Sequence, residues 1–311
     1  MVELIHKRSN WRLRRLELSS LNLFQVPVEV LCSALCDLEE VSLMFARPSL
    51  AQMTGLLTGV RERERLTLSK LDLASVDLSR LPAQLLAEAA CKLTEINLTG
   101  TNLSPDKLVT MFTVLGQTED VKLQSLNVSY CRLSAVLPPV LCSVVSKLSH
   151  VNLHAAHLTR SQSQTLVREL QEMTHLDLGY NDLSSVPSHM VAGLLCRAAH
   201  LDVTGCCLTS SQTEDMFSFI ATTKQSINLR SLQISNNDLS SISPDTLSKV
   251  ARKLDVVNFN QTCLTCDQVT FLQNNNVPRD QLKARGHNAN DCSLLRNVDV
   301  LLENHFVKYE L

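Results

Sequence analysis

A short unit of alternating apolar and polar residues recurs along this 311-residue chain, and its recurrence constrains the fold more than any other feature. The most regular copy is MTHLDLGYNDL, in which the fixed positions are Met173, Leu176, Leu178, Asn181 and Leu183. Ten copies follow at steps of 25 to 31 residues, and their markers, equivalent to Leu176, are Leu16, Val41, Leu66, Ile96, Leu126, Val151, Leu176, Leu201, Leu232 and Val257. This periodicity predicts a solenoid, in which each repeat buries its apolar face against its neighbours.

Within each copy the sequence predicts a short strand followed by a helix. Alternating residues such as Leu176 and Leu178 point to one face of a strand, and successive strands are expected to form one parallel sheet. Serine and proline mark three helix starts, at Ser104-Pro105-Asp106, Ser185-Val186-Pro187 and Ser243-Pro244-Asp245. An amphipathic stripe follows the last of them, at Leu247, Val250, Ala251 and Leu254. Two helix types alternate, which predicts a doubled repeat of about 50 to 60 residues.

The unit matches the leucine-rich-repeat template L-x-x-L-x-L-x-x-N-x-L, although the template asparagine is present only at Asn181 and Asn237. With full helices between the strands, residues 11 to about 270 resemble the ribonuclease-inhibitor-like class, which is similar to the sensor region of NOD-like receptors of innate immunity. The resemblance implies an α/β leucine-rich-repeat solenoid, a horseshoe with a curved parallel sheet on its concave face and helices on its convex face. That class includes inhibitors, receptor sensor regions, GTPase regulators and adaptors, so the fold alone does not select a function.

The repeat pattern suggests three segments. Residues 1–10 are expected to be an N-terminal end or truncated cap, residues 11–264 the array of about ten repeats, and residues 265–311 a C-terminal cap. The pattern fails after Leu264, where three asparagines, Pro278 and Gly286 interrupt it. Repeat arrays need such caps for solubility. Origin from a larger parent chain remains open.

Composition limits the classes of partner and the compartment. A net charge of -2 and a pI near 6.5 give no sign of nucleic-acid binding. The sequence shows neither a secretory signal nor an apolar run long enough for a membrane span, so we expect a cytoplasmic protein. Its 11 cysteines are scattered among apolar residues, as reduced buried thiols are.

Positions that flank the inward leucines are expected on the concave face, where equivalent residues of neighbouring repeats align. His150, His175 and His200 form one such row, Asp177 and Asp202 lie beside it, and His154 is close by. Three interpretations stay open for this row. The first is a pH-sensitive binding surface, because imidazole titrates near neutrality. The second is a metal site, because imidazole and carboxylate bind zinc. The third is an ordinary solvated face.

Two of the three tyrosines, Tyr130 and Tyr180, fall in a further row on either side of Ala155. Tyrosine supplies contact area and a hydroxyl at low entropic cost, so both are candidate anchors for a partner. Met44 and Phe45 form a second exposed apolar spot near the N-terminal end. In the third copy the same reading places Arg65 and Thr67 on this face.

No catalytic residue and no cofactor is predicted. The chain has no phosphate-binding glycine loop, no G-x-S-x-G and no H-E-x-x-H. Cys263-x-x-Cys266 has the spacing of half a zinc site, but no second pair follows, so no metal is predicted. The run RERER, residues 61 to 65, is expected to be a solvated helix end and strand start.

The sequence therefore predicts a non-enzymatic recognition module, of receptor-sensor or inhibitor/adaptor type, that binds a protein partner on its concave face. The predicted partner-binding residues are Tyr130, His150, His154, His175, Asp177, Tyr180, His200 and Asp202. An alternative is a GTPase-activating or other regulator of a partner enzyme, for which Arg15, Arg65 and Arg160 are available to stabilise charge in phosphoryl transfer. A mainly structural spacer is the third possibility.

Overall fold

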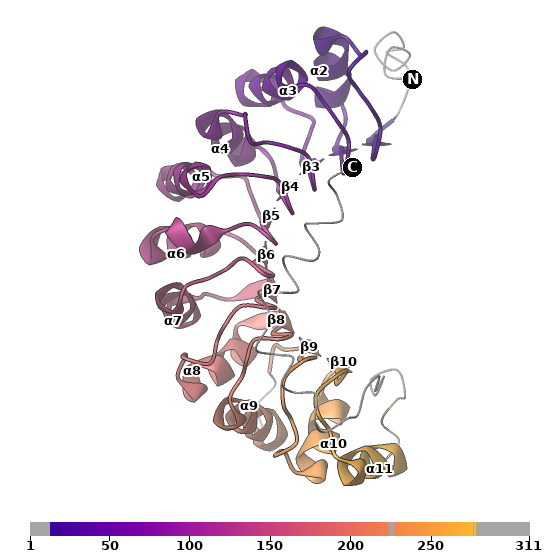
Figure 1. Cartoon of the computed structure of the whole chain (residues 1–311), viewed down its shortest axis with the longest axis vertical. Helices are drawn as coiled ribbons and strands as arrows, with labels where there is room; N and C mark the ends of the chain where they lie inside the picture. Colours follow the sequence, from indigo (N-terminus) through magenta and orange to yellow (C-terminus); the bar gives the residue numbers. More distant parts are fainter. Residues whose placement is uncertain (1–12, 224–226, 276, 278–311) are drawn as a thin grey trace. The chain divides into compact units, whose positions relative to one another are not determined.

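The computed structural model describes residues 13–223, 227–275 and 277, which belong to two compact units, unit 1 (Met1–Leu170) and unit 2 (Gln171–Leu311). In each unit the strands lie side by side in one layer and the helices form a second layer (Figure 1). The chain alternates between the layers, so every repeat contributes one strand and, after it, one helix. The α/β leucine-rich-repeat architecture is confirmed in both units.

Unit 1 pairs its strands in parallel and in sequence order. The strands are β1 (Arg15–Glu17), β2 (Glu40–Ser42), β3 (Lys70–Asp72), β4 (Glu95–Asn97), β5 (Ser125–Asn127) and β6 (His150–Asn152). The helices are α2 (Val28–Cys36), α3 (Leu50–Glu62), α4 (Ala83–Lys92), α5 (Pro105–Gln117), α6 (Pro138–Val145) and α7 (Arg160–Glu169), with a short 3-10 turn η1 (Leu133–Ala135).

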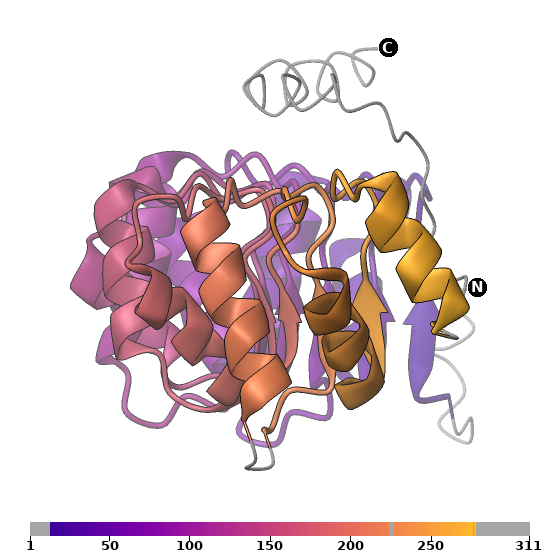
Figure 2. The same ribbon diagram turned by 90° about the horizontal axis from the view of Figure 1, so that it is seen from below.

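Unit 2 repeats the arrangement. Its strands are β7 (Met173–Asp177), β8 (Ala198–Asp202), β9 (Ser231–Gln233) and β10 (Val256–Asn258), again parallel. Its helices are α8 (Ser188–Gly193), α9 (Ser210–Thr222), α10 (Pro244–Lys253) and α11 (Cys266–Asn274), with the 3-10 turn η2 (Leu194–Cys196). Figure 2 shows the helices of this unit, orange to yellow, running alongside the strands, as a strand-to-helix connection between parallel strands requires.

Nine of the ten predicted strand markers lie within a strand, and the third is wrong. β3 is centred on Leu71, which is buried, whereas Leu66 lies in the loop before it. The register pairs Val41 with Leu71 and Leu71 with Ile96. Arg65 and Thr67 are therefore not on the sheet, and Lys70 and Asp72 take their places. The error arose because Leu66 and Leu71 both fit an apolar alternation, and residues 66–72 offer two registers five residues apart.

The core lies between the two layers. Strand residues such as Val41, Ile96 and Leu232 are 0% exposed, and so are helix residues such as Leu56 and Phe217. Strands repeat at about 4.8 Å and packed helices at about 8–10 Å, so a stack with one of each per repeat curves with its strands on the inner side. Within each unit the sheet therefore has a concave outer face.

A buried glutamine, which the sequence reading missed, ties every second repeat to the one before it. In α9 the side chain of Gln212, 1% exposed, accepts a hydrogen bond from the Thr209 N–H at 2.7 Å. Its Nε2 donates to the carbonyls of Leu183 at 2.7 Å and Val186 at 2.6 Å. The same bonds recur at Gln52, Gln162 and Gln268.

These glutamines confirm the doubled repeat. Each closes a capping box whose first residue is Ser49, Thr159, Thr209 or Thr265. In α5 the equivalent residue is Lys107, whose Nζ donates to the Ser79 carbonyl and, at 2.7 Å, to the Leu81 carbonyl. The five positions lie 55, 55, 50 and 56 residues apart.

The other helices begin at proline. Ser243 caps α10 through its side chain, and Leu247, Val250 and Ala251 are buried as predicted. The predicted cap at Ser185 is wrong by two residues: Pro187, with φ -55° and ψ 137°, occupies the cap position, and α8 begins at Ser188. The predicted C-terminal cap opens with α11, whose capping box is that of a repeat helix; positions 278–311 and the N-terminal segment 1–10 lie outside the described residues.

Candidate functional site

A row of alternating charges runs across the first strands of unit 1. Arg15 pairs with Glu40 at 3.0 Å and Lys70 with Glu95 at 2.9 Å, on strands that are register neighbours. The hydrogen bond to Glu95 raises the pKa of Lys70. These side chains are 38–77% exposed, so each pair stabilises the sheet by no more than about 1 kcal/mol. The sequence analysis did not single out this row, and it placed Arg65 where Lys70 lies.

The next row along the strands contains Asp177 and Asp202, and its side chains stabilise the turn after each strand. Asp177 and Asp202 each accept, through Oδ1, a hydrogen bond from the backbone N–H two residues further on, at 2.8 Å. Asparagines at the equivalent positions make the same bond at 2.9–3.1 Å; they are Asn97, Asn127, Asn152 and Asn258. These bonds hold the turn after each strand. An amide oxygen therefore suffices for the turn, and the negative charges of Asp177 and Asp202 exceed what it requires.

In unit 2 the predicted histidines meet. His175 and His200 are register partners on β7 and β8, and their rings stack with centroids 4.2 Å apart and an angle of 9° between the planes. Asp177 and Asp202 are also register partners, on the same two strands. The sheet face of unit 2 thus presents a double imidazole surface beside two carboxylates.

Tyr180 lies next to this group and reaches across two repeats. Its hydroxyl accepts a hydrogen bond from Asn236 Nδ2 at 2.9 Å. A Cβ added to Gly205, which lies between them in the row of turns, would come within 3.0 Å of the Tyr180 ring. The absence of a side chain at Gly205 therefore leaves room for the Tyr180 ring. All three residues adopt positive φ, at 54°, 60° and 57°.

The remaining predicted residues belong to unit 1. Tyr130 and His154 form a tilted ring pair with centroids 5.5 Å apart, and Tyr130 is 38% exposed. His150 Nδ1 lies 2.8 Å from the Ser149 hydroxyl. The predicted set thus divides into Tyr130, His150 and His154 in unit 1 and His175, Asp177, Tyr180, His200 and Asp202 in unit 2.

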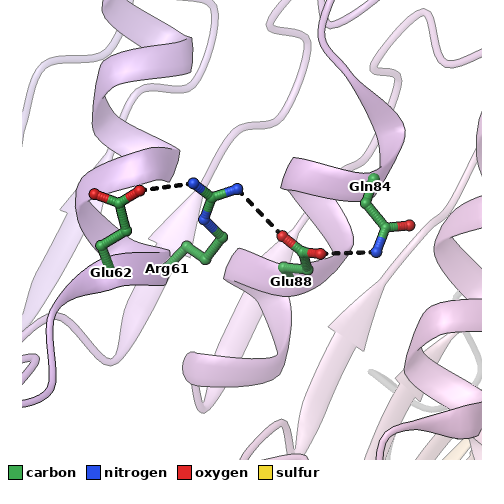
Figure 3. A network of polar contacts seen from close by, with 4 residues as sticks. All are labelled: Arg61, Glu62, Gln84 and Glu88. Carbon is green, nitrogen blue, oxygen red and sulfur yellow. Dashed lines mark hydrogen bonds and ion pairs between the residues drawn. The ribbon is translucent and has the colours of Figure 1, made fainter.

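A second polar cluster lies on the helical layer of unit 1. Arg61 donates to Glu62 at 2.7 Å and to Glu88 on α4 at 3.4 Å, and Gln84 donates to Glu88 at 2.7 Å (Figure 3). Arg63, which directly follows α3, pairs with Asp37, which directly follows α2. The RERER run is a helix end as predicted, since Arg61 and Glu62 end α3, but the predicted strand start is wrong, because β3 begins only at Lys70. The contacts connect neighbouring helices.

The three arginines of the GTPase-activating alternative are not grouped into a site. Arg15 is paired with Glu40, Arg65 lies in the loop between α3 and β3, and Arg160 is the first residue of α7. They come from a strand, a loop and a helix. No observation favours this alternative over binding.

Burial disfavours the thiolate form of several cysteines. Nine cysteines within the described ranges are free, and burial raises the pKa of Cys131 to about 11. Burial likewise raises the pKa of Cys206. A low pKa is what makes a thiol a nucleophile or metal ligand. Over residues 13–223, 227–275 and 277, no group of three or more metal-binding side chains is found.

Comparison with known proteins agrees with this architecture. The family model described as Leucine Rich Repeat matches residues 122–144 and 228–250, each of which contains one strand and most of the following helix. Two repeats of the chain thus match the family model, and the chain has the leucine-rich-repeat fold. Solenoids of this kind provide extended concave surfaces that bind other proteins. In the described part of the chain, no helix is long and apolar enough to cross a membrane.

Among curated proteins, the chain resembles NACHT, LRR and PYD domains-containing protein 4E of Mus musculus, with 28% identity over 196 residues. The match covers 59% of this chain but only 20% of the mouse protein. It supports the resemblance to the leucine-rich-repeat regions of NOD-like receptors.

Three solved structures are similar at low identity. LegL7 of Legionella pneumophila has a TM-score of 0.48 at 13% identity, over 88% of this chain and 99% of its own. The Rad7 and Elc1 complex of yeast gives 0.40 at 15%, over 82% and 77%, and human 5T4 gives 0.42 at 18%, over 88% and 85%.

Proposed function

We propose that this leucine-rich-repeat protein is a non-enzymatic recognition module that binds a protein partner through the sheet faces of its units. The observation that carries the proposal is the group formed by His175, His200 and Tyr180 in unit 2. Two stacked rings and a tyrosine fixed by a hydrogen bond present a rigid aromatic surface. Tyrosine is enriched among the residues that dominate binding energies.

The scaffold favours binding because it is ordered in advance. Short parallel strands hold these side chains in register, so the partner does not have to offset the cost of ordering loops. Tyr130 and His154 supply a smaller aromatic pair on unit 1. By resemblance to NOD-like receptors, the proposed context is a cytoplasmic sensor region, or a free-standing inhibitor or adaptor.

The test is affinity capture from cytosolic extract followed by binding measurements with the captured protein. Wild type is compared with the double variant H175A/Y180A and with the matched control Q84A/E88A, which alters two residues on the helical layer. We expect Q84A/E88A to bind like wild type and H175A/Y180A to bind at least about 30-fold more weakly, since a tyrosine hot spot contributes about 2 kcal/mol or more. Melting temperatures of all three proteins check that they are folded.

Capture at about pH 7.5 and about pH 6 tests the pH-sensitive interpretation, because histidine charge changes over this interval. Equal affinity of wild type and H175A/Y180A at both values would remove the unit 2 surface from the proposal. Retention of nothing by wild type would favour the structural spacer.

A further inference from the structure

Large apolar side chains are exposed in the strand-to-helix loops of the first two repeats of unit 1. Phe24, in the loop before α2, is 64% exposed, and Leu50, the first residue of α3, is 47% exposed. Phe45, in the turn after β2, is 45% exposed, as predicted from the sequence. Single exposed apolar residues are common on protein surfaces, whereas a group of them marks an interaction surface.

Backbone and side-chain contacts bring these two loops together. Asn22 and Arg47 form a parallel bridge, so the loops run side by side, as α2 and α3 do (Figure 1). Gln52, in the first turn of α3, donates to the Leu23 carbonyl at 2.6 Å, next to Phe24 in the chain. The Asn22 side chain accepts a hydrogen bond from the Phe24 N–H at 3.1 Å. Phe24 and the exposed start of α3 are therefore neighbours in loops that are ordered before a partner binds.

The repeat forms without large apolar side chains at these two loop positions. In the later repeats of the same type, the residues equivalent to Phe24 are all exposed serines, namely Ser79, Ser134, Ser184 and Ser240. The residues equivalent to Leu50 are also exposed, and none is a large apolar residue; they are Pro105, Arg160, Ser210 and Cys266. A serine at either position is thus compatible with the loop and with the helix start.

A positive charge lies within this group. We name the group the loop patch; its residues are Phe24, Phe45, Arg47 and Leu50. Arg47 is exposed and forms no ion pair among the residues that the structure describes. The hydrogen bond from the Ser79 N–H, and among charges Arg80, lower the pKa of Asp77, the equivalent of Arg47 in the next repeat. Glu29 lies in the first turn of α2, whereas the first turn of α3 has no acidic residue to balance its helix dipole.

We propose that the loop patch binds an acidic amphipathic helix of a protein partner, with apolar side chains on Phe24 and Leu50 and a carboxylate paired with Arg47. Neighbouring repeats are about 4.8 Å apart at their strands and about 8–10 Å apart at their helices. Side chains at i and i+4 of a helix lie about 6 Å apart, between these spacings, so one helix spans both apolar residues. Arginine pairs with carboxylates through two parallel hydrogen bonds. The loop patch lies beside the sheet face, so this inference goes beyond the proposed function.

The test titrates the full chain into three fluorescein-labelled helical peptides of equal length and follows fluorescence anisotropy at low salt. The acidic peptide carries leucines at i, i+4 and i+7 with glutamates beside this stripe. The basic peptide has lysine for each glutamate, and the alanine peptide has alanine for each leucine. We expect saturable binding of the acidic peptide and about tenfold weaker binding of the other two. The net charge of the chain, -2, favours the basic peptide, so the expected order reports the local charge of Arg47.

Three variants locate the site. The double variant F24S/L50S introduces serines that equivalent positions already hold, so we expect an unchanged melting temperature and about tenfold weaker binding of the acidic peptide. Arg47→Glu is expected to reverse the preference, so that the basic peptide binds more tightly than the acidic one. The matched control R132Q/L137S replaces an exposed arginine and an exposed leucine of the fifth repeat and is expected to bind like wild type.

Equal binding of the acidic and basic peptides would overturn the proposal, and so would an F24S/L50S protein that binds like wild type or an Arg47→Glu protein that still prefers the acidic peptide. The absence of saturable binding would also overturn it; a concentration-dependent dimer that F24S/L50S abolishes would then assign the loop patch to a second copy of this chain. H175A/Y180A is expected to bind the acidic peptide like wild type, so the loop patch and the sheet face of unit 2 are tested separately.

Discussion

Replacing Gln212 by leucine tests whether the buried glutamines hold the repeats together. The substitution keeps the side-chain volume, so little cavity forms, but it removes three hydrogen bonds, from the Thr209 N–H and to the carbonyls of Leu183 and Val186. The Leu183 carbonyl retains the bond from the Val186 N–H at 2.9 Å. Two backbone groups thus lose a partner and a third loses one of two.

The magnitude follows from these losses. An unsatisfied buried backbone group costs about 1–3 kcal/mol and a lost second bond about 0.5–1.5 kcal/mol, while burial of the leucine returns part of this. We expect Gln212→Leu to lower the free energy of unfolding by about 2–5 kcal/mol. Thr209→Ala removes only the bond from the Gln212 N–H to the threonine hydroxyl, at 3.2 Å, and should cost about 1 kcal/mol.

Urea unfolding followed by circular dichroism measures the difference, and amide hydrogen exchange shows where it acts. Because repeats are stabilised mainly by their neighbours, faster exchange should concentrate in α8, α9 and the connection between them. The reasoning is refuted if Gln212→Leu is no less stable than Thr209→Ala, or if exchange rises uniformly across unit 2.

Three further predictions concern single sites. Cys196 is exposed and Cys206 fully buried, so a thiol reagent should modify Cys196 in the native protein and Cys206 only after unfolding; early modification of Cys206, detected by mass spectrometry, would contradict its burial. The hydrogen bond from the backbone N–H two residues on lowers the pKa of Asp77 from its usual 3.8. Its stabilisation is therefore present above about pH 3.8 and lost as pH falls through the lower folded value, so Asp77→Asn should reduce the acid-induced fall in melting temperature below that pH; an unchanged acid profile would argue against it. Gly205→Ala, at φ +60° and with its Cβ 3.0 Å from the Tyr180 ring, should cost about 1–2 kcal/mol and displace the ring, which the tyrosine fluorescence or its NMR shifts will report.

The repeat period was enough to predict the architecture, because the strand markers are spaced by the fold itself. The period failed locally where the sequence offers two apolar alternations, as at Leu66 and Leu71. Only the neighbouring strands decide between such registers, through the pairing of Leu71 with Val41 and Ile96. The strand propensities of residues 66–72 alone do not indicate which residue pairs with the neighbouring strands.

The buried glutamines belong to a pattern that is visible in the sequence. The pattern [ST]-x-x-Q recurs at residues 49–52, 159–162, 209–212 and 265–268, at the start of alternate helices. As a capping box it predicts a helix start. The contacts to carbonyls 26 and 29 residues earlier needed the structure, because they join two repeats whose separation in space no local pattern gives.

For the candidate site, the sequence placed residues in rows but not the contacts within them. The stacking of His175 on His200 follows from adjacent equivalent positions, whereas the reach of Tyr180 to Asn236 depends on the missing side chain at Gly205. The predicted role of Asp202 beside histidine also changed, since one of its oxygens holds a turn.

Each position of the repeat occurs several times in this chain, so residues at equivalent positions can be compared. The comparison shows which side-chain properties the fold requires and which it does not. Asn97 and Asp202 make the same turn bond, so the turn requires a side-chain oxygen at this position but not a negative charge. Where Gly205 adopts φ +60° and Tyr130 adopts φ +59°, the fold asks for a left-handed backbone, which a bulky side chain adopts at a cost of about 1 kcal/mol. The turn bond thus does not require the charge at Asp202, and the left-handed backbone does not require the ring at Tyr130. Such residues are where substitutions should change binding before they change stability.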